Sequence, residues 1–197
     1  QWLYRSVMGW CTQAVDSIAD RLVFTKFLDD NFNMQTIFEQ NNMDILFDSA
    51  IRGALITSCD FIYISADEKG FPRMQVIDGS NATGIIDPIT HLLIEGYAVL
   101  ERDDNDNPIT ELYFKPYSTT VIKQGDHKVF VEEYGNNVPY ALLVPIIFKP
   151  DSNRYFGHSR ISRACIDIVD KARNTITRSE VSAEFYAFPQ KYVTNLS

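Results

Sequence analysis

Residues 60–78 read DFIYISADEKGFPRMQVID, and they mark the point where the chain changes from helical to β-strand patterning. Two short runs rich in β-branched and aromatic residues flank a segment that contains Gly70 and Pro72. Such runs predict strands, and Gly and Pro between them predict a hairpin turn. The stretch therefore predicts the first hairpin of an antiparallel sheet.

More strand patterns follow this hairpin. The turn sequences DNDNP and NNVP separate them, and Gly125-Asp126 joins another pair, whereas residues 78–84, DGSNATG, read as a loop. The expected strands lie at residues 95–103, 109–116, 118–124, 127–134 and 140–148. The middle of the chain thus predicts an antiparallel meander of six to eight strands.

The segments before the sheet show helical spacing. A first helix is expected within residues 2–22 and a second helical region at residues 33–59, broken near Asn41 and Asn42, with a short extended piece at 23–27. The apolar positions of the first helix are Leu3, Val7, Ala14, Val15, Ile18 and Leu22. The pattern predicts an α+β fold in which helices flank an antiparallel β meander, ending in one long helix.

That last helix is expected from Arg160 to Ala187, a stretch without Gly or Pro, with Ser159 as its N-cap. It would hold about 28 residues and measure about 42 Å. Its expected apolar stripe is narrow and consists of Ile161, Cys165, Ile168, Ala172, Ile176, Ala183 and Tyr186. A long helix with so few apolar residues predicts packing beside parallel neighbours rather than in a core.

Charged residues flank the stripe. Asp167 and Lys171 stand four positions apart in the favourable order, and Arg163–Asp167 and Asp170–Arg173 are expected as weaker ion pairs. We take the charged side chains as candidate subunit contacts, because two unlike polar faces suit a head-to-tail interface. The candidates are Arg160, Arg163, Asp167, Asp170, Lys171, Arg173, Arg178, Glu180 and Glu184.

Composition excludes several classes of protein. The 197 residues carry a net charge of −8, which argues against a surface that grips phosphate groups. Cys11, Cys59 and Cys165 are odd in number and form no CxxC, so we expect small buried thiols in a reducing compartment rather than disulfides or zinc. No apolar run approaches the roughly 18 residues that a membrane span requires.

No catalytic pattern stands out. The acidic turn that begins at Asp103 fails the EF-hand pattern, which predicts a solvated hairpin tip rather than a calcium site. His91, His127 and His158 have no partner at metal-ligand spacing, and Cys59 has no evident base beside it. We therefore expect no enzyme, no metal and no cofactor. An enzymatic alternative is an acidic hydrolase that uses Asp44, Asp48 or Asp60.

Taken together, the segments resemble the portal, or head-to-tail connector, proteins of long-tailed bacteriophages. AVDSIADRLVF (residues 14–24) resembles the family's first helix, and SAIRGALITSCDFIYIS (49–65) resembles its helix-to-strand junction. The most specific part is residues 136–192, where NNVPYALLVPIIF precedes GHSRIS and a long helix ends in AEFYAFPQKY. A departure is His158-Ser159-Arg160, where the family tends to Arg-Ser-Glu.

The resemblance implies a homo-oligomeric ring of about twelve subunits at one capsid vertex, found in the virion and, during assembly, in the host cytoplasm. Double-stranded DNA would pass through the ring non-specifically. The terminase packaging motor would dock on the ring while the capsid is filled with DNA, and tail or adaptor proteins would bind it afterwards. No membrane partner is expected. Residues 1–150 would form a wing-like α+β domain, and residues 151–197 the first stem-like helix and the start of a clip. The chain would then be roughly the first half of a portal protein.

The main alternative is a non-enzymatic α+β adaptor that binds a protein partner with its long helix. Such an adaptor would be a monomer or small oligomer, whereas a portal would form rings.

Overall fold

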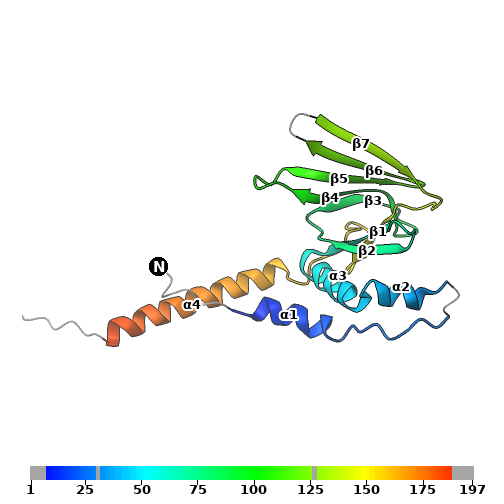
Figure 1. Ribbon diagram of the computed structural model, residues 1–197. Helices are drawn as coiled ribbons and strands as arrows, with labels where there is room; N and C mark the ends of the chain where they lie inside the picture. The colour runs from blue at the N-terminus through cyan, green and yellow to red at the C-terminus, as the bar shows by residue number, and fades with distance from the viewer. Residues whose placement is uncertain (1–7, 30–31, 126–127, 188–197) are drawn as a thin grey trace, which may run out of the picture. The chain divides into compact units, whose positions relative to one another are not determined.

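The computed structural model describes residues 8–29, 32–125 and 128–187 (Figure 1). The helices in that part of the chain are α1 (Trp10–Ala19), α2 (Met34–Gln40), α3 (Met43–Thr57) and α4 (Arg163–Ala187). The strands are β1 (Cys59–Ala66), β2 (Pro72–Ile77), β3 (Ala82–Ile86), β4 (Leu93–Arg102), β5 (Pro108–Lys115), β6 (Ser118–Gly125), β7 (Lys128–Gly135) and β8 (Leu143–Ile147). The α+β prediction is confirmed.

The chain divides into two compact units. One comprises residues 15–160, and the other combines the residues up to Ala14 with those from Ile161 onward. The predicted core positions Leu3 and Val7 lie outside the described residues. The first helix itself is shorter than its pattern indicated, and Leu22, beyond its end, is exposed.

The break between α2 and α3 is confirmed. Asn42 has a φ of 48°, a left-handed conformation that asparagine tolerates better than most residues. The neighbouring Asn41 fixes the corner, because its amide group donates to the carbonyls of Ile37 and Pro72 at 2.8 and 3.0 Å and accepts the N–H of Met74 at 3.1 Å. The corner is therefore bonded to β2 as well as to its own helix.

The strands form two antiparallel sheets rather than one meander. The five-stranded sheet follows chain order, β3-β4-β5-β6-β7, whereas β8 returns to pair with β1 in a three-stranded sheet of order β2-β1-β8. The loop predicted at residues 78–84 is wrong at its end, because β3 begins at Ala82. Gly84 permits this pairing, since a Cβ there would lie 2.5 Å from the carbonyl oxygen of Glu95.

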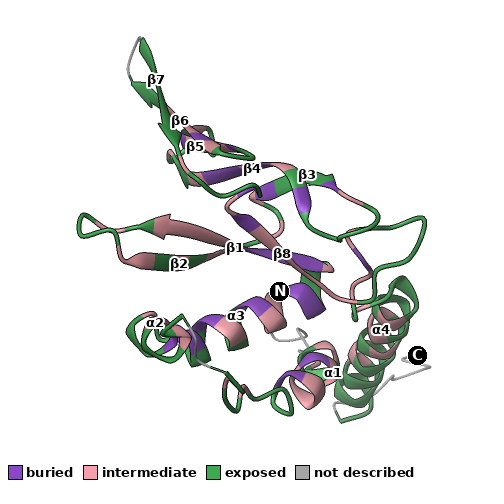
Figure 2. Cartoon of the chain, turned by 90° about the vertical axis from the view of Figure 1, so that its right-hand side faces the viewer, coloured by how far each residue is buried: buried purple, intermediate pink, exposed green. Residues whose placement is uncertain are grey.

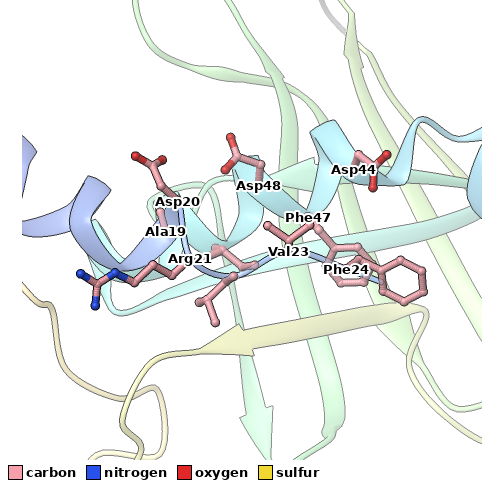
Figure 3. A pocket seen from close by; sticks show the side chains of 10 residues that line it. Ala19, Asp20, Arg21, Val23, Phe24, Asp44, Phe47 and Asp48 are labelled. Carbon is pink, nitrogen blue, oxygen red and sulfur yellow. The ribbon is translucent and has the colours of Figure 1, made fainter. Parts of the chain in front are cut away.

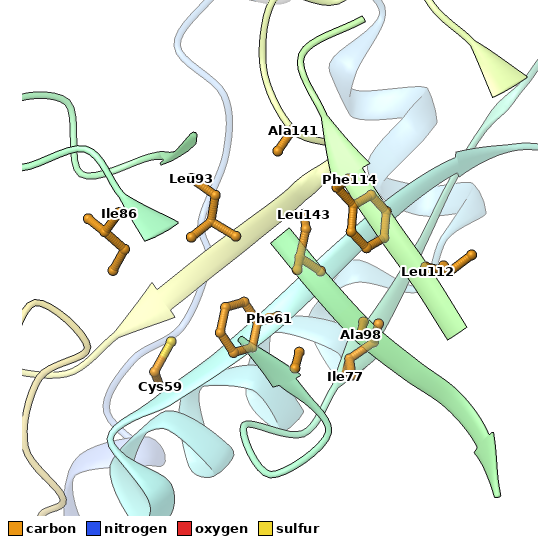
Figure 4. Close-up of a cluster of buried hydrophobic side chains, with 11 residues drawn as sticks. Cys59, Phe61, Ile77, Ile86, Leu93, Ala98, Leu112, Phe114, Ala141 and Leu143 are labelled. Carbon is orange, nitrogen blue, oxygen red and sulfur yellow. The ribbon is translucent and has the colours of Figure 1, made fainter. Parts of the chain in front are cut away.

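The side chains of β1 alternate between two apolar clusters. Phe61 joins Leu112, Phe114 and Leu143 in the cluster between the two sheets, which Figure 4 shows. Ile62 points the other way, into the cluster that α2 and α3 contribute. This larger unit thus has three layers, helices, three-stranded sheet and five-stranded sheet, with β1 in the middle one (Figures 1 and 2).

A buried carboxylate ties the end of α3 to the loop after β2. The Asp60 carboxylate accepts hydrogen bonds from the N–H of Gly79 at 3.0 Å and from the hydroxyl of Thr57 at 3.1 Å. Asp60 is only 3% exposed. Burial raises the pKa of Asp60 despite these bonds. Its carboxylate lies directly against Gly53, where a Cβ would come within 1.7 Å of Oδ2. Gly53 is therefore needed for space, not for backbone conformation.

Within residues 8–29, 32–125 and 128–187, no helix is both long enough and apolar enough to cross a lipid bilayer.

Candidate functional site: the long helix α4

The long helix begins later than predicted. Ser162 caps α4, because its Oγ accepts the N–H of Cys165 at 3.3 Å. The expected cap, Ser159, instead donates its hydroxyl to the carbonyl of Ile56 at 2.5 Å, and the N–H of Arg160 donates to the carbonyl of Leu55 at 2.8 Å. These two bonds hold the chain against the end of α3, so the helix cannot begin before Arg163. The predicted end at Ala187 is confirmed.

Most of the surface of α4 is exposed. None of its 25 residues is buried, and Figure 2 shows the helix without any buried segment. The predicted apolar stripe is only partly right, because Ile168 is 60% exposed and Tyr186 is 85% exposed. The partly buried residues of α4 are Cys165, Val169, Asp170, Ala172, Thr177 and Val181.

The charged residues of α4 separate into two arcs. At about 100° per residue, one arc of about 80° holds three cations and one carboxylate, and a second arc of about 80° holds three carboxylates and one cation. We name them the basic arc and the acidic arc. The basic arc is Arg163, Asp167, Lys171 and Arg178, and the acidic arc is Asp170, Arg173, Glu180 and Glu184. The two arcs lie next to each other, with centres about 100° apart around the helix.

Eight of the nine candidate contact residues therefore lie on α4, four in each arc, and the ninth, Arg160, precedes the helix. All are exposed except Asp170, which is partly buried. Among the expected ion pairs, Arg173–Asp170 is present at 2.9 Å. In the described part of the chain, Asp167 makes no ion pair within 4.0 Å with Lys171 or Arg163. The basic arc is thus not neutralised by pairs inside the helix.

The thiols differ from the expectation of three buried cysteines. Cys59 is buried, but Cys11 and Cys165 are partly exposed, and all three are free. Burial, followed by a contact with Cys165, raises the pKa of Cys11. Burial also raises the pKa of Cys59 to about 12, so at neutral pH this residue is a thiol and a poor nucleophile.

The other sequence candidates have local structural roles. Asp103 accepts the backbone N–H groups of Asn105 and Asn107 at 2.9 and 2.7 Å, which makes the acidic turn a hairpin tip, as predicted. His158 lies 2.5 Å from Asp151 and, as the main cause, lowers the pKa of that carboxyl to about 2. His127 lies outside the described residues. The described residues contain no group of three His, Cys, Asp or Glu side chains able to hold a metal ion.

The hydrolase alternative required its carboxylates to converge in a cleft. A groove of about 570 Å³ lies beside α3 and contains Asp44, Asp48 and Asp20 above the rings of Phe24 and Phe47 (Figure 3). Asp60 is not among its lining residues, and none of the ten described side chains that line it is a histidine, cysteine or serine.

An arginine that is not among the lining residues pairs with two of the carboxylates of this groove. Arg52 binds Asp20 at 2.6 Å, Asp48 at 3.0 Å and Asp16 as well. The hydrogen bond with Asp48 is the main cause of a raised pKa at Arg52. Asp20 and Asp48 therefore belong to a structural ion-pair network that joins the end of α1 to α3.

Two features were missed from the sequence. Ser162 could have been found as the cap, because a second serine three residues after Ser159 is an equal candidate. The complete exposure of β7 has no sequence signal, since VFV in residues 129–131 reads as a buried strand.

Neither the known protein families nor the curated proteins contain a match to this chain.

Proposed function

We propose that the protein is a structural subunit of a phage portal ring, with α4 as a stem helix beside the equivalent helix of the next subunit. In this proposal the ring forms the channel for DNA packaging and ejection at the capsid vertex. The terminase motor docks on it during packaging, and tail or adaptor proteins bind it afterwards. The protein acts as a conduit and not as an enzyme.

The observation that carries the proposal is the exposure of α4. None of its 25 residues is buried, although helices in proteins gain most of their stability from tertiary packing. A helix that its own chain covers only in part, and buries nowhere, calls for further neighbours. The resemblance of residues 136–192 to portal proteins supplies the kind of neighbour, namely further copies of the same helix around a channel.

The charge of the chain supports a conduit. A protein that neutralises many phosphates gains salt-dependent affinity and holds the duplex in place. The net charge of −8 and the mixture of both signs along α4 oppose such a grip. DNA would therefore contact the ring weakly and without sequence preference.

Negative-stain electron microscopy of the full-length protein tests the proposal. We expect rings of about twelve subunits with a central hole, and a native mass that matches the ring. A monomer or small oligomer at micromolar concentration would refute the portal function. The adaptor alternative would then be favoured, because the same exposed helix can bind a heterologous partner.

A further inference from the structure

We infer that the basic arc of α4 in one subunit contacts the acidic arc of α4 in the next subunit, so that ring closure depends on opposite charges across every interface. The inference rests on the proposed ring and identifies the surfaces that meet in it. The partner is a second copy of this chain.

The two arcs are complementary in charge. The basic arc carries three cations and one carboxylate, the acidic arc carries three carboxylates and one cation, and the two arcs occupy different sides of one helix. A head-to-tail interface joins two different surfaces of the same subunit, which are then reused at each step around the ring. Two surfaces of opposite charge meet this requirement, whereas like-charged surfaces would repel each other at every interface.

The two arcs also face directions that suit the two neighbours in a ring. The two arcs together span about 180° of the helix surface, with Lys171 and Glu180 at the outer edges. In a ring of about twelve parallel helices, the two neighbours of each helix lie in directions about 150° apart. Both directions fall within the arcs, and long Lys, Arg and Glu side chains can reach across the remaining angle.

Opposite charges on the two arcs lie at similar heights along the helix. Cyclic symmetry places equivalent residues at the same height along the ring axis. Lys171 and Asp170 differ in height by about 1.5 Å along a helix, and Arg178 and Glu180 by about 3 Å. Lys171 of one subunit therefore lies level with Asp170 of the next, which is partly buried and shares its carboxylate with Arg173 of its own helix, and Arg178 lies level with Glu180. These two pairs can form together without any shift of one helix along the other.

The test reverses each arc separately in the full-length protein. The double variant Lys171→Glu, Arg178→Glu gives the basic arc one cation and three carboxylates. The double variant Asp170→Lys, Glu180→Lys gives the acidic arc three cations and one carboxylate. Each variant alone brings like charges together, so we expect ring assembly to require at least about tenfold more protein than the wild type does.

Two further samples separate the inference from simple damage to the subunit. An equimolar mixture of the two double variants can alternate around a ring with opposite charges at every interface, and we expect it to assemble. The fourfold variant exchanges the signs of both arcs, keeps the wild-type net charge, and should also assemble. An unfolded subunit would be rescued in neither sample. The double variant Lys69→Glu, Lys123→Glu makes the same change in net charge as the basic-arc variant, on exposed positions outside α4, and should assemble normally.

Ring content is measured by analytical ultracentrifugation and negative-stain microscopy, with circular dichroism to compare helix content. Higher salt should reduce the defect of each single-arc variant, because it screens repulsion between exposed charges. Wild-type-like assembly of both single-arc variants would overturn the inference and leave the portal ring intact. Failure of both the mixture and the fourfold variant would also overturn it. Absence of rings from the wild-type protein itself would instead refute the proposed function, and the inference with it.

Discussion

Replacing Gly53 with alanine sets two physical effects against each other. Gly53 lies inside α3 with no special backbone angle, so helix propensity alone predicts a gain in stability of about 1 kcal/mol. The structure predicts a loss, because the new Cβ would lie 1.7 Å from Oδ2 and 2.4 Å from Cγ of Asp60. Asp60 is buried and has no room to move without breaking its own hydrogen bonds.

The size of the loss follows from those bonds. Displacing the carboxylate removes its hydrogen bonds from the Gly79 N–H and the Thr57 hydroxyl, and a bond to a charged group contributes about 1.5–3 kcal/mol. Overpacking adds about 1–3 kcal/mol. After the propensity gain is subtracted, we expect the variant to lose at least about 3 kcal/mol of unfolding free energy. Urea denaturation followed by far-ultraviolet circular dichroism measures it.

Two comparisons make the test specific. Gly135→Ala is the control, because a Cβ at that position has no neighbour within 4 Å, and its stability should change by less than about 0.5 kcal/mol. In an Asp60→Ala background the obstacle is gone, so Gly53→Ala should become neutral or stabilising. A stabilising effect of Gly53→Ala in the wild-type background would refute the steric reasoning, as would an unchanged loss in the Asp60→Ala background.

Three further predictions concern other parts of the chain. Ser162→Ala should speed amide exchange in the first turn of α4 about two- to fivefold, because the variant loses the N-cap hydrogen bond, whereas Ser159→Ala should leave that turn unchanged. Hydrogen exchange with mass spectrometry measures both variants. The reverse pattern would show that Ser159 is the cap, as the sequence indicated. Cys59 should resist iodoacetamide at pH 8 until the protein unfolds, because its thiol is buried. Cys11 is partly exposed and should react in the folded state, although more slowly than an ordinary thiol because its pKa is raised. Peptide mapping decides, and rapid native labelling of Cys59 would contradict its burial. Burial raises the pKa of Asp60 above 3.8, so the folded state binds this proton more tightly than the unfolded state does, and wild-type stability falls as the pH rises from the unfolded pKa through the folded one. Asp60→Asn lacks this loss, so its stability relative to the wild type should increase between pH 4 and pH 7 in urea titrations. A constant difference between the two proteins would contradict the raised pKa.

Local patterns predicted most of the elements. The hairpin around Gly70, the break at Asn42 and the end of α4 at Ala187 all appear where turn residues and helical spacing placed them. Each of these features depends on a few neighbouring residues, which is why the sequence carries them.

Long-range contacts were harder to predict. The return of β8 to β1 depends on an apolar cluster whose members, such as Phe61 and Leu143, lie far apart in the chain, and no local signal separates one sheet from two. The start of α4 was displaced by hydrogen bonds from Ser159 and Arg160 to the end of α3. The division of the charges on α4 into two arcs was only partly visible, because the sequence shows both signs but the exact helical span decides which residues share a face.

The pairing of β1 with β8 also bears on how the chain folds. Residues 59–63 pair with residues 143–147, so roughly 80 residues must be synthesised between the two halves of this ladder, and closing so long a loop is slow. The hairpins from β3 to β7 join neighbours in sequence and can form as the chain leaves the ribosome. Phe61 remains uncovered by Leu143 until β8 emerges, so the nascent chain exposes an apolar strand edge throughout that interval. Growth temperature and chaperone supply should therefore limit the yield of soluble protein more strongly than the stability of the finished fold does.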